Sequence, residues 1–284
     1  YWLMRELQDR PEFELATLVS GTHLSPEFGS TITAIKCDGI PVTEEVEMLL
    51  SSDTSVGLAK SLGLGVIGYT EAINRISPDF FVVLGDRYEA LAAAQAAYIL
   101  RVPIVHIHGG EVTEGAIDDA FRHCITKLSS IHCTSCEKYR QRVIQLGEKP
   151  SSVFNLGAIG LDHISRTKLM SLDDLAISLG FDLTKNYFLV TYHPETLADG
   201  DNTFDFQMIL DALTAFPDFK VLFTYPNADY GSREIIRLID AYVNNHSARC
   251  LAVASLGQAR YLSAIKHATV VIGNSSSGVI EAPS

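Results

Sequence analysis

The sequence has few of the features that mark secreted, membrane-bound or nucleic-acid-binding proteins. Its five cysteines are odd in number and scattered, which suits a reduced cytoplasm better than a disulfide framework. No apolar run is long enough to cross a bilayer, and no signal-peptide pattern is present. Lys and Arg number 22 against 34 Asp and Glu, and no basic patch stands out, so nucleic-acid binding is not expected.

Metal-binding motifs are also scarce. Cys133 and Cys136 form a lone CxxC, whereas a structural zinc site needs a second pair or two further ligands nearby. Cys133 lies inside the apolar segment 131–134, which is typical of a strand. We therefore favour ordinary reduced core cysteines and expect no metal site.

The two commonest phosphate-binding motifs are missing as well. There is no Walker loop, and no GxGxxG follows a predicted strand, so a phosphate or dinucleotide held in either way is not expected. No redox cofactor is predicted. A net charge of -12 means that an anionic ligand would have to be held by local cations and backbone N–H groups.

What the chain does have is a regular alternation of strands and helices over 284 residues, enough for two domains. We predict an α/β protein with two doubly wound, Rossmann-like domains, residues 1–165 and 166–284, joined by a hinge within 161–185. The glycines within helix 56–76 leave open whether that helix packs closely or is kinked. Predicted strands span 15–19, 40–42, 80–84, 103–107, 131–134, 153–156, 187–191, 221–224 and 270–272, with helices 1–10, 31–35, 56–76, 137–146, 203–215, 234–244 and 259–266 among those between them.

The stretch 105–127 carries the strongest functional signal. A buried strand ends at a glycine pair, a loop with Glu111 and Asp118 follows, and a helix then carries Arg122. In parallel sheets this arrangement presents polar side chains at the carboxyl edge. Asp86 and Arg87 follow the preceding strand, so we expect Asp86 and the acidic loop to face one crevice. The alternative is a charged surface turn.

The second half offers two further candidates. His193 ends the first strand of the second domain, where it is either a site residue or a simple strand-end residue. The loop Gly273-Asn274-Ser275-Ser276-Ser277-Gly278 precedes a helix that begins near Glu281. Its backbone N–H groups and hydroxyls could hold an anion, and Glu281 could accept bonds from a ribose. A serine helix cap with a stabilising glutamate is the equally good alternative.

Several of these blocks together resemble the hydrolysing UDP-N-acetylglucosamine 2-epimerases of sialic acid biosynthesis. The resemblance runs from end to end of the chain and in order. It rests on Gly85-Asp86-Arg87-Tyr88-Glu89, His106-Ile107-His108-Gly109-Gly110-Glu111, Ile117-Asp118-Asp119 with Arg122-His123, Arg142-Val143-Ile144-Gln145-Leu146-Gly147-Glu148, His193-Pro194-Glu195-Thr196 and the 273–278 loop.

The resemblance implies a glycosyltransferase-B-like fold with the active site in the cleft between two Rossmann-like domains. By comparison with that family, we expect both ends to be truncated: the first strand of domain 1–165 and the closing part of domain 166–284 are missing. It also implies a homo-oligomer, and a bacterial cytoplasm fits the chemistry and the cysteines.

The implied reaction converts UDP-GlcNAc to UDP and N-acetylmannosamine. UDP leaves by anti elimination to a 2-acetamidoglucal, and syn addition of water follows with inversion at C2, so neither a cofactor nor a metal is needed. The resemblance makes Asp86, Glu111 and Asp118 the candidate acid/base residues and directs His193 and Arg87 at the diphosphate. Asn274, Ser275, Ser276, Ser277 and Glu281 would bind the nucleotide.

Some questions stay open at this point. Many relatives have glutamate where this chain has His108, so either His108 or Glu111 takes that glutamate's task. The same chemistry on UDP-N,N′-diacetylbacillosamine, for legionaminic acid, is the nearest rival function. A non-hydrolysing epimerase that returns UDP-ManNAc and a non-catalytic UDP-sugar-binding relative are the others. A glycosyltransferase is disfavoured because no acceptor site is suggested.

Overall fold

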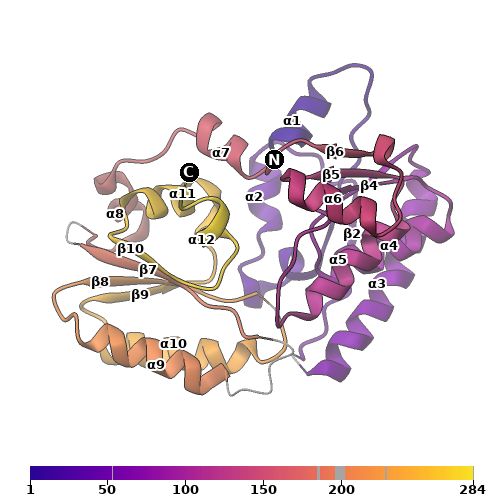
Figure 1. Ribbon diagram of the computed structural model, residues 1–284. Helices are drawn as coiled ribbons and strands as arrows, with labels where there is room; N and C mark the ends of the chain where they lie inside the picture. The colour runs from indigo at the N-terminus through magenta and orange to yellow at the C-terminus, as the bar shows by residue number, and fades with distance from the viewer. Residues whose placement is uncertain (53, 184–185, 196–201, 228, 284) are drawn as a thin grey trace. The chain divides into compact units, whose positions relative to one another are not determined.

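The computed structural model describes the chain except residues 53, 184–185, 196–201, 228 and 284. The described chain forms two compact units, Tyr1–Ile159 and Gly160–Ser284. A division after residue 165 would cut helix α7 (Leu161–Arg166), so we describe the units with the boundary in front of that helix. Both units are α/β, each with a four-stranded parallel sheet (Figure 1).

The first unit begins with short elements and continues as a regular alternation of strand and helix. Its strands are β1 (Leu18–Ser20), β2 (Glu44–Val46), β3 (Phe81–Leu84), β4 (Ile104–Ile107), β5 (Ile131–Thr134) and β6 (Val153–Asn155). Its helices are α1 (Trp2–Gln8), α2 (Ile32–Cys37), α3 (Ser55–Ile76), α4 (Tyr88–Ile99), α5 (Ile117–Leu128) and α6 (Glu137–Gln145), with short 3-10 turns at Gly21–Leu24, Pro26–Phe28 and Pro150–Ser152.

The main sheet of this unit has the order β3-β4-β5-β6, all parallel, and β1 pairs with β2 in a separate two-stranded sheet. Because consecutive strands are neighbours and parallel, the loops that follow β3, β4 and β5 lie at one edge of the sheet. Val83 pairs in register with His106, and His106 with His132, so these side chains share one face. The topology therefore collects the loops at Gly85, His108 and Ser135.

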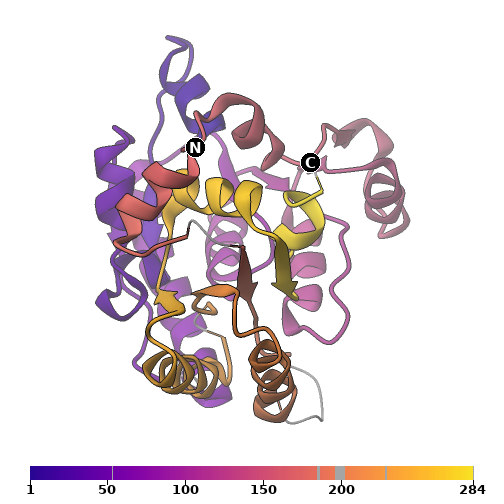
Figure 2. The same cartoon turned by 90° about the vertical axis from the view of Figure 1, so that its left-hand side faces the viewer.

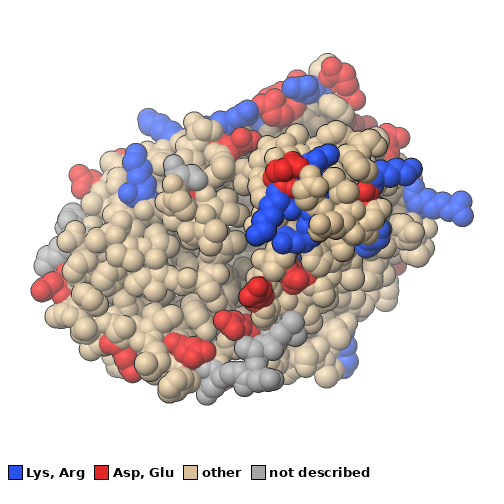
Figure 3. Space-filling view, viewed as in Figure 1, with Lys and Arg blue, Asp and Glu red and all other residues tan. Residues whose placement is uncertain are grey.

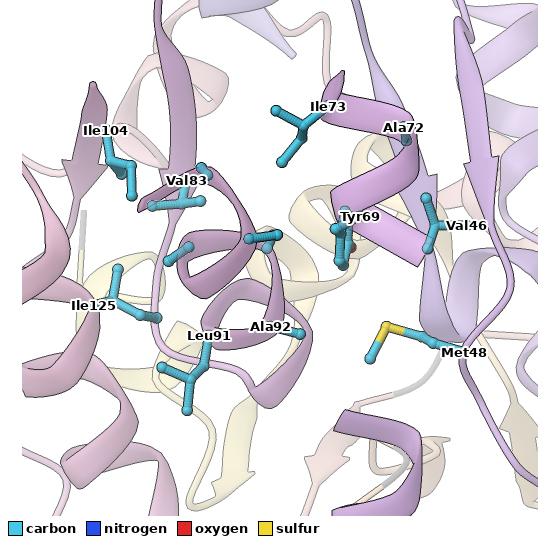
Figure 4. Close-up of a cluster of buried hydrophobic side chains, with 14 of the residues drawn as sticks. Val46, Met48, Tyr69, Ala72, Ile73, Val83, Leu91, Ala92, Ile104 and Ile125 are labelled. Atoms are coloured by element: carbon cyan, nitrogen blue, oxygen red, sulfur yellow. The ribbon is translucent and has the colours of Figure 1, made fainter. Parts of the chain in front are cut away.

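The core of the first unit lies where α3 and α4 cover the sheet (Figure 4). Most of the buried residues of α4 are alanines, which lets α3 approach closely. A Cβ at Gly65 of α3 would lie 2.6 Å from Met48 Cε and 3.0 Å from Ala92 Cβ. Helix α3 is continuous from Ser55 to Ile76, so its glycines do not break it; Gly65 and Gly68 lie at close contacts, whereas a Cβ at Gly63 would meet nothing within 4 Å.

Two predictions in this unit were inaccurate. The strand expected at 40–42 forms at Glu44–Val46, after Pro41, which has no N–H to donate to a strand partner. The strand predicted at 15–19 forms at Leu18–Ser20. Both are edge regions in which few apolar residues set the register.

The second unit repeats the alternation. Its strands are β7 (Tyr187–Thr191), β8 (Lys220–Thr224), β9 (Cys250–Val253) and β10 (Val270–Gly273), and its helices are α7, α8 (Leu172–Leu179), α9 (Asn202–Thr214), α10 (Ser232–Asn245), α11 (Gly257–His267) and α12 (Ser277–Ile280). The sheet order is β10-β7-β8-β9, with all strands parallel.

Three layers build this unit: α9 and α10 lie on one side of the sheet, and α8 and α11 on the other (Figure 2). Strand β7 is buried along its whole length, and its residues alternate between the two cores. Phe188 and Val190 pack towards α9 and α10, whereas Tyr187 and Leu189 pack towards α8 and α11. A continuous apolar run is what a strand covered on both faces requires.

Sequence reasoning missed two elements here, β9 and α7. β9 is an edge strand, paired with β8 among the described strands, and its sequence Cys250-Leu251-Ala252-Val253 is an apolar run of only four residues, which periodicity alone does not assign to a strand. α7 has no buried residue and no apolar face that would reveal it. Residues 184–185, at the end of the expected hinge, lie outside the described part of the chain.

Candidate functional site

Asp86 and Arg122 form the most buried ion pair at the sheet edge of the first unit. Asp86 follows β3, and Arg122, on α5, has a side chain only 4% exposed. The guanidinium also donates to Asp119 Oδ1 at 3.1 Å and to Thr113 Oγ1 at 2.9 Å. The backbone N–H of Thr113 donates to the same Asp119 oxygen at 2.8 Å. One buried cation therefore ties the β3 loop to the acidic loop, as the expected common crevice requires.

Glu111 has a different set of partners. Its Oε1 lies 2.7 Å from His108 Nδ1 and accepts a hydrogen bond of 2.7 Å from the Ser135 hydroxyl. Burial alone would raise the pKa of Glu111, but the hydrogen bonds from His108 and Ser135, together with the nearby charge of Arg122, outweigh it and lower that pKa. Glu111 is therefore held as a carboxylate at neutral pH.

The glycine pair after β4 is required by close contacts. Gly110 has φ +82°, and a Cβ there would lie 2.4 Å from the Tyr139 carbonyl oxygen. Arg142 of α6 donates to the Gly110 carbonyl. His108 itself has φ +66°, an uncommon conformation for a residue other than glycine. The acidic loop is thus anchored to α6.

The remaining candidates of the first unit are Asp118 and Arg87. Asp118 is half-buried in the first turn of α5. Arg87, expected to face a diphosphate, donates through Nε to Glu89 Oε2 at 3.2 Å. Whether these two side chains act on a substrate stays a prediction.

His106 lies directly behind this loop and is fully buried. Its Nε2 is 2.8 Å from the Gly85 carbonyl oxygen, which can only accept, so Nε2 carries the proton. Its Nδ1 faces the Thr126 hydroxyl at 3.2 Å. Burial lowers the pKa of His106 to about 4, despite the bond to Gly85. A neutral histidine therefore supports the β3 loop that carries Asp86.

This burial predicts acid sensitivity. The unfolded chain takes up a proton on His106 near pH 6.5, but the folded chain does so only near pH 4, so stability falls as the pH falls through that window. The full effect is roughly 3 kcal/mol. Urea unfolding at pH 7.5 and at pH 5 should show the loss. A His106→Gln variant should depend less steeply on pH, and an unchanged slope would contradict this assignment.

In the second unit, His193 follows β7 and is held by its neighbours. Asn274 accepts from the His193 backbone N–H at 2.8 Å and donates to the His193 carbonyl at 2.7 Å. The Asn227 N–H approaches His193 Nδ1 at 3.4 Å. Gly273, with φ +139°, passes so close to β7 that a Cβ would lie 1.7 Å from the Thr191 carbonyl oxygen. The loops after β7 and β10 are therefore locked together, and Thr196 lies outside the described residues.

The serine loop leads into the short helix α12. Ser277 donates to Glu281 Oε2 at 2.7 Å, a contact between side chains, whereas the cap residue Ser276 makes no side-chain cap hydrogen bond. The Ser277 N–H approaches Ser275 Oγ at 3.4 Å, and Ser276 stands at the helix start. In this arrangement one Glu281 oxygen already has a partner within the loop. Nucleotide binding by these residues stays a prediction.

Sequence reasoning did not single out Asp119, Thr113 and Ser135, which position the acidic groups. Ser135 follows β5 directly, so its place at a strand end was the available signal. Among the described residues, no group of three or more His, Cys, Asp or Glu is arranged to hold a metal ion. Nor does any described helix have the length and apolarity that a membrane span needs.

Charge on the surface is mixed. On the face shown in Figure 3, several Lys and Arg side chains gather in one cluster beside a few acidic ones, other acidic side chains are scattered, and most of that face is uncharged. That face has no continuous basic stripe of the kind that follows a nucleic-acid backbone.

Comparison with known proteins gives consistent matches along the chain. The family model described as UDP-N-acetylglucosamine 2-epimerase matches residues 5–284. A Campylobacter jejuni protein named GDP/UDP-N,N′-diacetylbacillosamine 2-epimerase (hydrolyzing) is 37% identical over 281 residues, covering 99% of this chain and 73% of its own length. The Escherichia coli polysialic acid biosynthesis protein P7 is 36% identical over 283 residues, covering 99% of this chain and 72% of its own.

A solved structure supports the fold. The Neisseria meningitidis UDP-GlcNAc 2-epimerase, crystallised with UDP-GlcNAc, superposes with a TM-score of 0.77 at 16% identity, covering 99% of this chain and 76% of that one. The prediction of two Rossmann-like, glycosyltransferase-B-type domains is thereby confirmed.

Proposed function

Because this chain belongs to the UDP-N-acetylglucosamine 2-epimerase family, we propose that it is a hydrolysing UDP-GlcNAc 2-epimerase, releasing UDP and N-acetylmannosamine. The observation that carries the proposal is the near-complete match, at 36–37% identity, to proteins that include a hydrolysing 2-epimerase. The site adds two carboxylates, Asp86 and Glu111, that are held separately at neighbouring strand ends.

The reaction needs two proton-transfer events at C2. In the elimination, the C2–H bond breaks, its electrons form the C1=C2 bond, and the C1–O bond breaks with its electron pair going to UDP. Water then attacks C1 and gives up one of its protons, while a proton reaches the other face of C2; the one net proton left over goes to the released UDP or to solvent. Two carboxylates with different partners are suited to taking a proton and returning one. We assign these steps to Asp86 and Glu111, with Asp118 as the third candidate.

The leaving diphosphate must be stabilised as the C1–O bond breaks. We assign this role to His193 and Arg87, and nucleotide binding to the loop of Asn274, Ser275, Ser276 and Ser277 with Glu281. These assignments are supported by the position of the residues, which lie just after strands or in or next to the short helix α12. In this assignment Asn274 acts partly by fixing the backbone of His193.

A second substrate fits the same comparisons. The relative at 37% identity is named for diacetylbacillosamine nucleotides, whose sugar differs from GlcNAc at C4 and C6. The C2 chemistry would be unchanged. A role in sialic-acid-type sugar synthesis, a cytoplasmic location and a homo-oligomeric state belong to this proposal.

The test is incubation with UDP-GlcNAc in D₂O, followed by proton and phosphorus NMR. Free UDP with N-acetylmannosamine deuterated at C2 is the expected result. UDP-ManNAc would indicate a non-hydrolysing enzyme. If only the diacetylbacillosamine nucleotide were consumed, in a parallel tube, the proposed substrate would be revised and the proposed mechanism would stand. UDP binding without turnover of either would contradict the proposal.

A further inference from the structure

Glu111 stands out because all its close contacts fall on one oxygen. His108 Nδ1 and the Ser135 hydroxyl both meet Oε1 at 2.7 Å. Among the residues that the structure describes, none makes a hydrogen bond or ion pair to Oε2. The side chain is 19% exposed, so the carboxylate is mostly enclosed but still reachable. One oxygen is fixed, and the other is available for a substrate.

The tautomer of His108 follows from its other neighbour. The backbone N–H of Ile159 approaches His108 Nε2 at 3.3 Å, and an N–H can only donate. Nε2 is therefore the acceptor, and the proton of a neutral imidazole lies on Nδ1, from which it is donated to Glu111. Both ring nitrogens are then engaged, and the lone pair that a histidine base would use is already occupied.

Ser135 is placed to do something other than cap a helix. It lies one residue before Cys136, the cap residue of α6, and α6 has no side-chain cap. Its hydroxyl instead reaches across 24 residues to Glu111. The left-handed backbone of His108 is likewise a conformation that persists only where surrounding contacts hold it.

We infer that His108 and Ser135 are positioning residues that fix Oε1 of Glu111, so that Oε2 exchanges the proton at C2. This assignment rests on the proposed function and resolves which of His108 and Glu111 does the acid/base work. Glu111 is the catalytic residue, and His108 orients it without exchanging a proton with the substrate.

The decisive variants separate positioning from proton transfer. Ser135→Ala should lower kcat about tenfold with little change in KM, since one bond to a charged group is lost. In the pH profile of kcat/KM for this variant, the acidic limb should move to higher pH, because the Glu111 carboxylate becomes easier to protonate when it loses a hydrogen-bond donor. Ser135→Thr, which keeps the hydroxyl, should restore both. A wild-type profile for Ser135→Ala would overturn the inference.

His108→Asn gives the second arm. Asparagine tolerates the left-handed backbone and keeps an N–H donor, so a positioning role predicts turnover within about tenfold of the wild type. A loss of 10²-fold or more, the size expected for a missing general base, would overturn the inference and make His108 the base. Ser129→Ala is the matched control for Ser135→Ala. It also removes a serine hydroxyl bond of 2.7 Å, but one made to the Ile125 carbonyl.

One readout does not depend on turnover. Carbon-13 NMR of labelled glutamate side chains should show Glu111 titrating at higher pH in Ser135→Ala than in the wild type and unchanged in Ser129→Ala. If the titration of Glu111 did not move, the proposed positioning of Glu111 by His108 and Ser135 would lose its physical basis, even in an inactive protein. If the wild type turned over neither nucleotide sugar, but Ser135→Ala still moved the titration of Glu111, the proposed function would be wrong and the positioning of Glu111 would stand.

Discussion

An Asp86→Asn enzyme should release UDP about 10²–10⁴-fold more slowly than the wild type. Asparagine has nearly the same shape and leaves an oxygen for Arg122 to donate to, but it can neither accept a proton at neutral pH nor carry the charge. The measurement is the initial rate of UDP release from UDP-GlcNAc, with circular dichroism to show that the variant is folded.

Asp119→Asn is the matched control for this experiment. Asp119 pairs with the same guanidinium at 3.1 Å and is 30% exposed, so its replacement also removes one negative charge beside Arg122. If Asp86 exchanges a proton with the substrate, the two variants should differ by at least tenfold. Equal losses would mean that both act through Arg122. Turnover of Asp86→Asn within about threefold of the wild type would exclude Asp86 from the chemistry.

Arg122→Met should be the most destabilising single change at the site, by about 3–5 kcal/mol. Methionine occupies similar space but leaves Asp86 and Asp119 without the cation that both contact. It also removes the donor to Thr113. The free energy of unfolding should be measured by urea denaturation at pH 7.5, following the transition of the first unit.

A double-mutant cycle identifies the cause. If uncompensated charge produces the loss, Arg122→Met combined with Asp86→Asn should be more stable than Arg122→Met alone. A double variant that is less stable by the sum of the two single losses would attribute the effect to packing. Arg75→Met, which breaks an exposed pair with Glu44, should leave the transition almost unchanged.

The sequence by itself determined the fold class and where to look for the site. Strands with continuous apolar runs, such as Tyr187–Thr191, can be identified because burial on both faces leaves no room for polar residues. The same pattern places Asp86, Glu111 and His193 after strands, at the edge where α/β proteins bind ligands. α7 escaped detection because an exposed helix needs little apolar patterning, and β9 because an apolar run of four residues can belong to a strand or to a buried helix.

Only the tertiary structure decided which side chains act together. The partners of Glu111 come from the loops after β4 and β5, and the guanidinium that Asp86 contacts comes from α5. Contacts between residues 24 or 36 positions apart leave no local pattern in the sequence, because they depend on how the backbone brings the loops together. For the same reason, our inference that Glu111 and not His108 does the acid/base work rests on a contact with the Ile159 N–H, 51 residues away from His108.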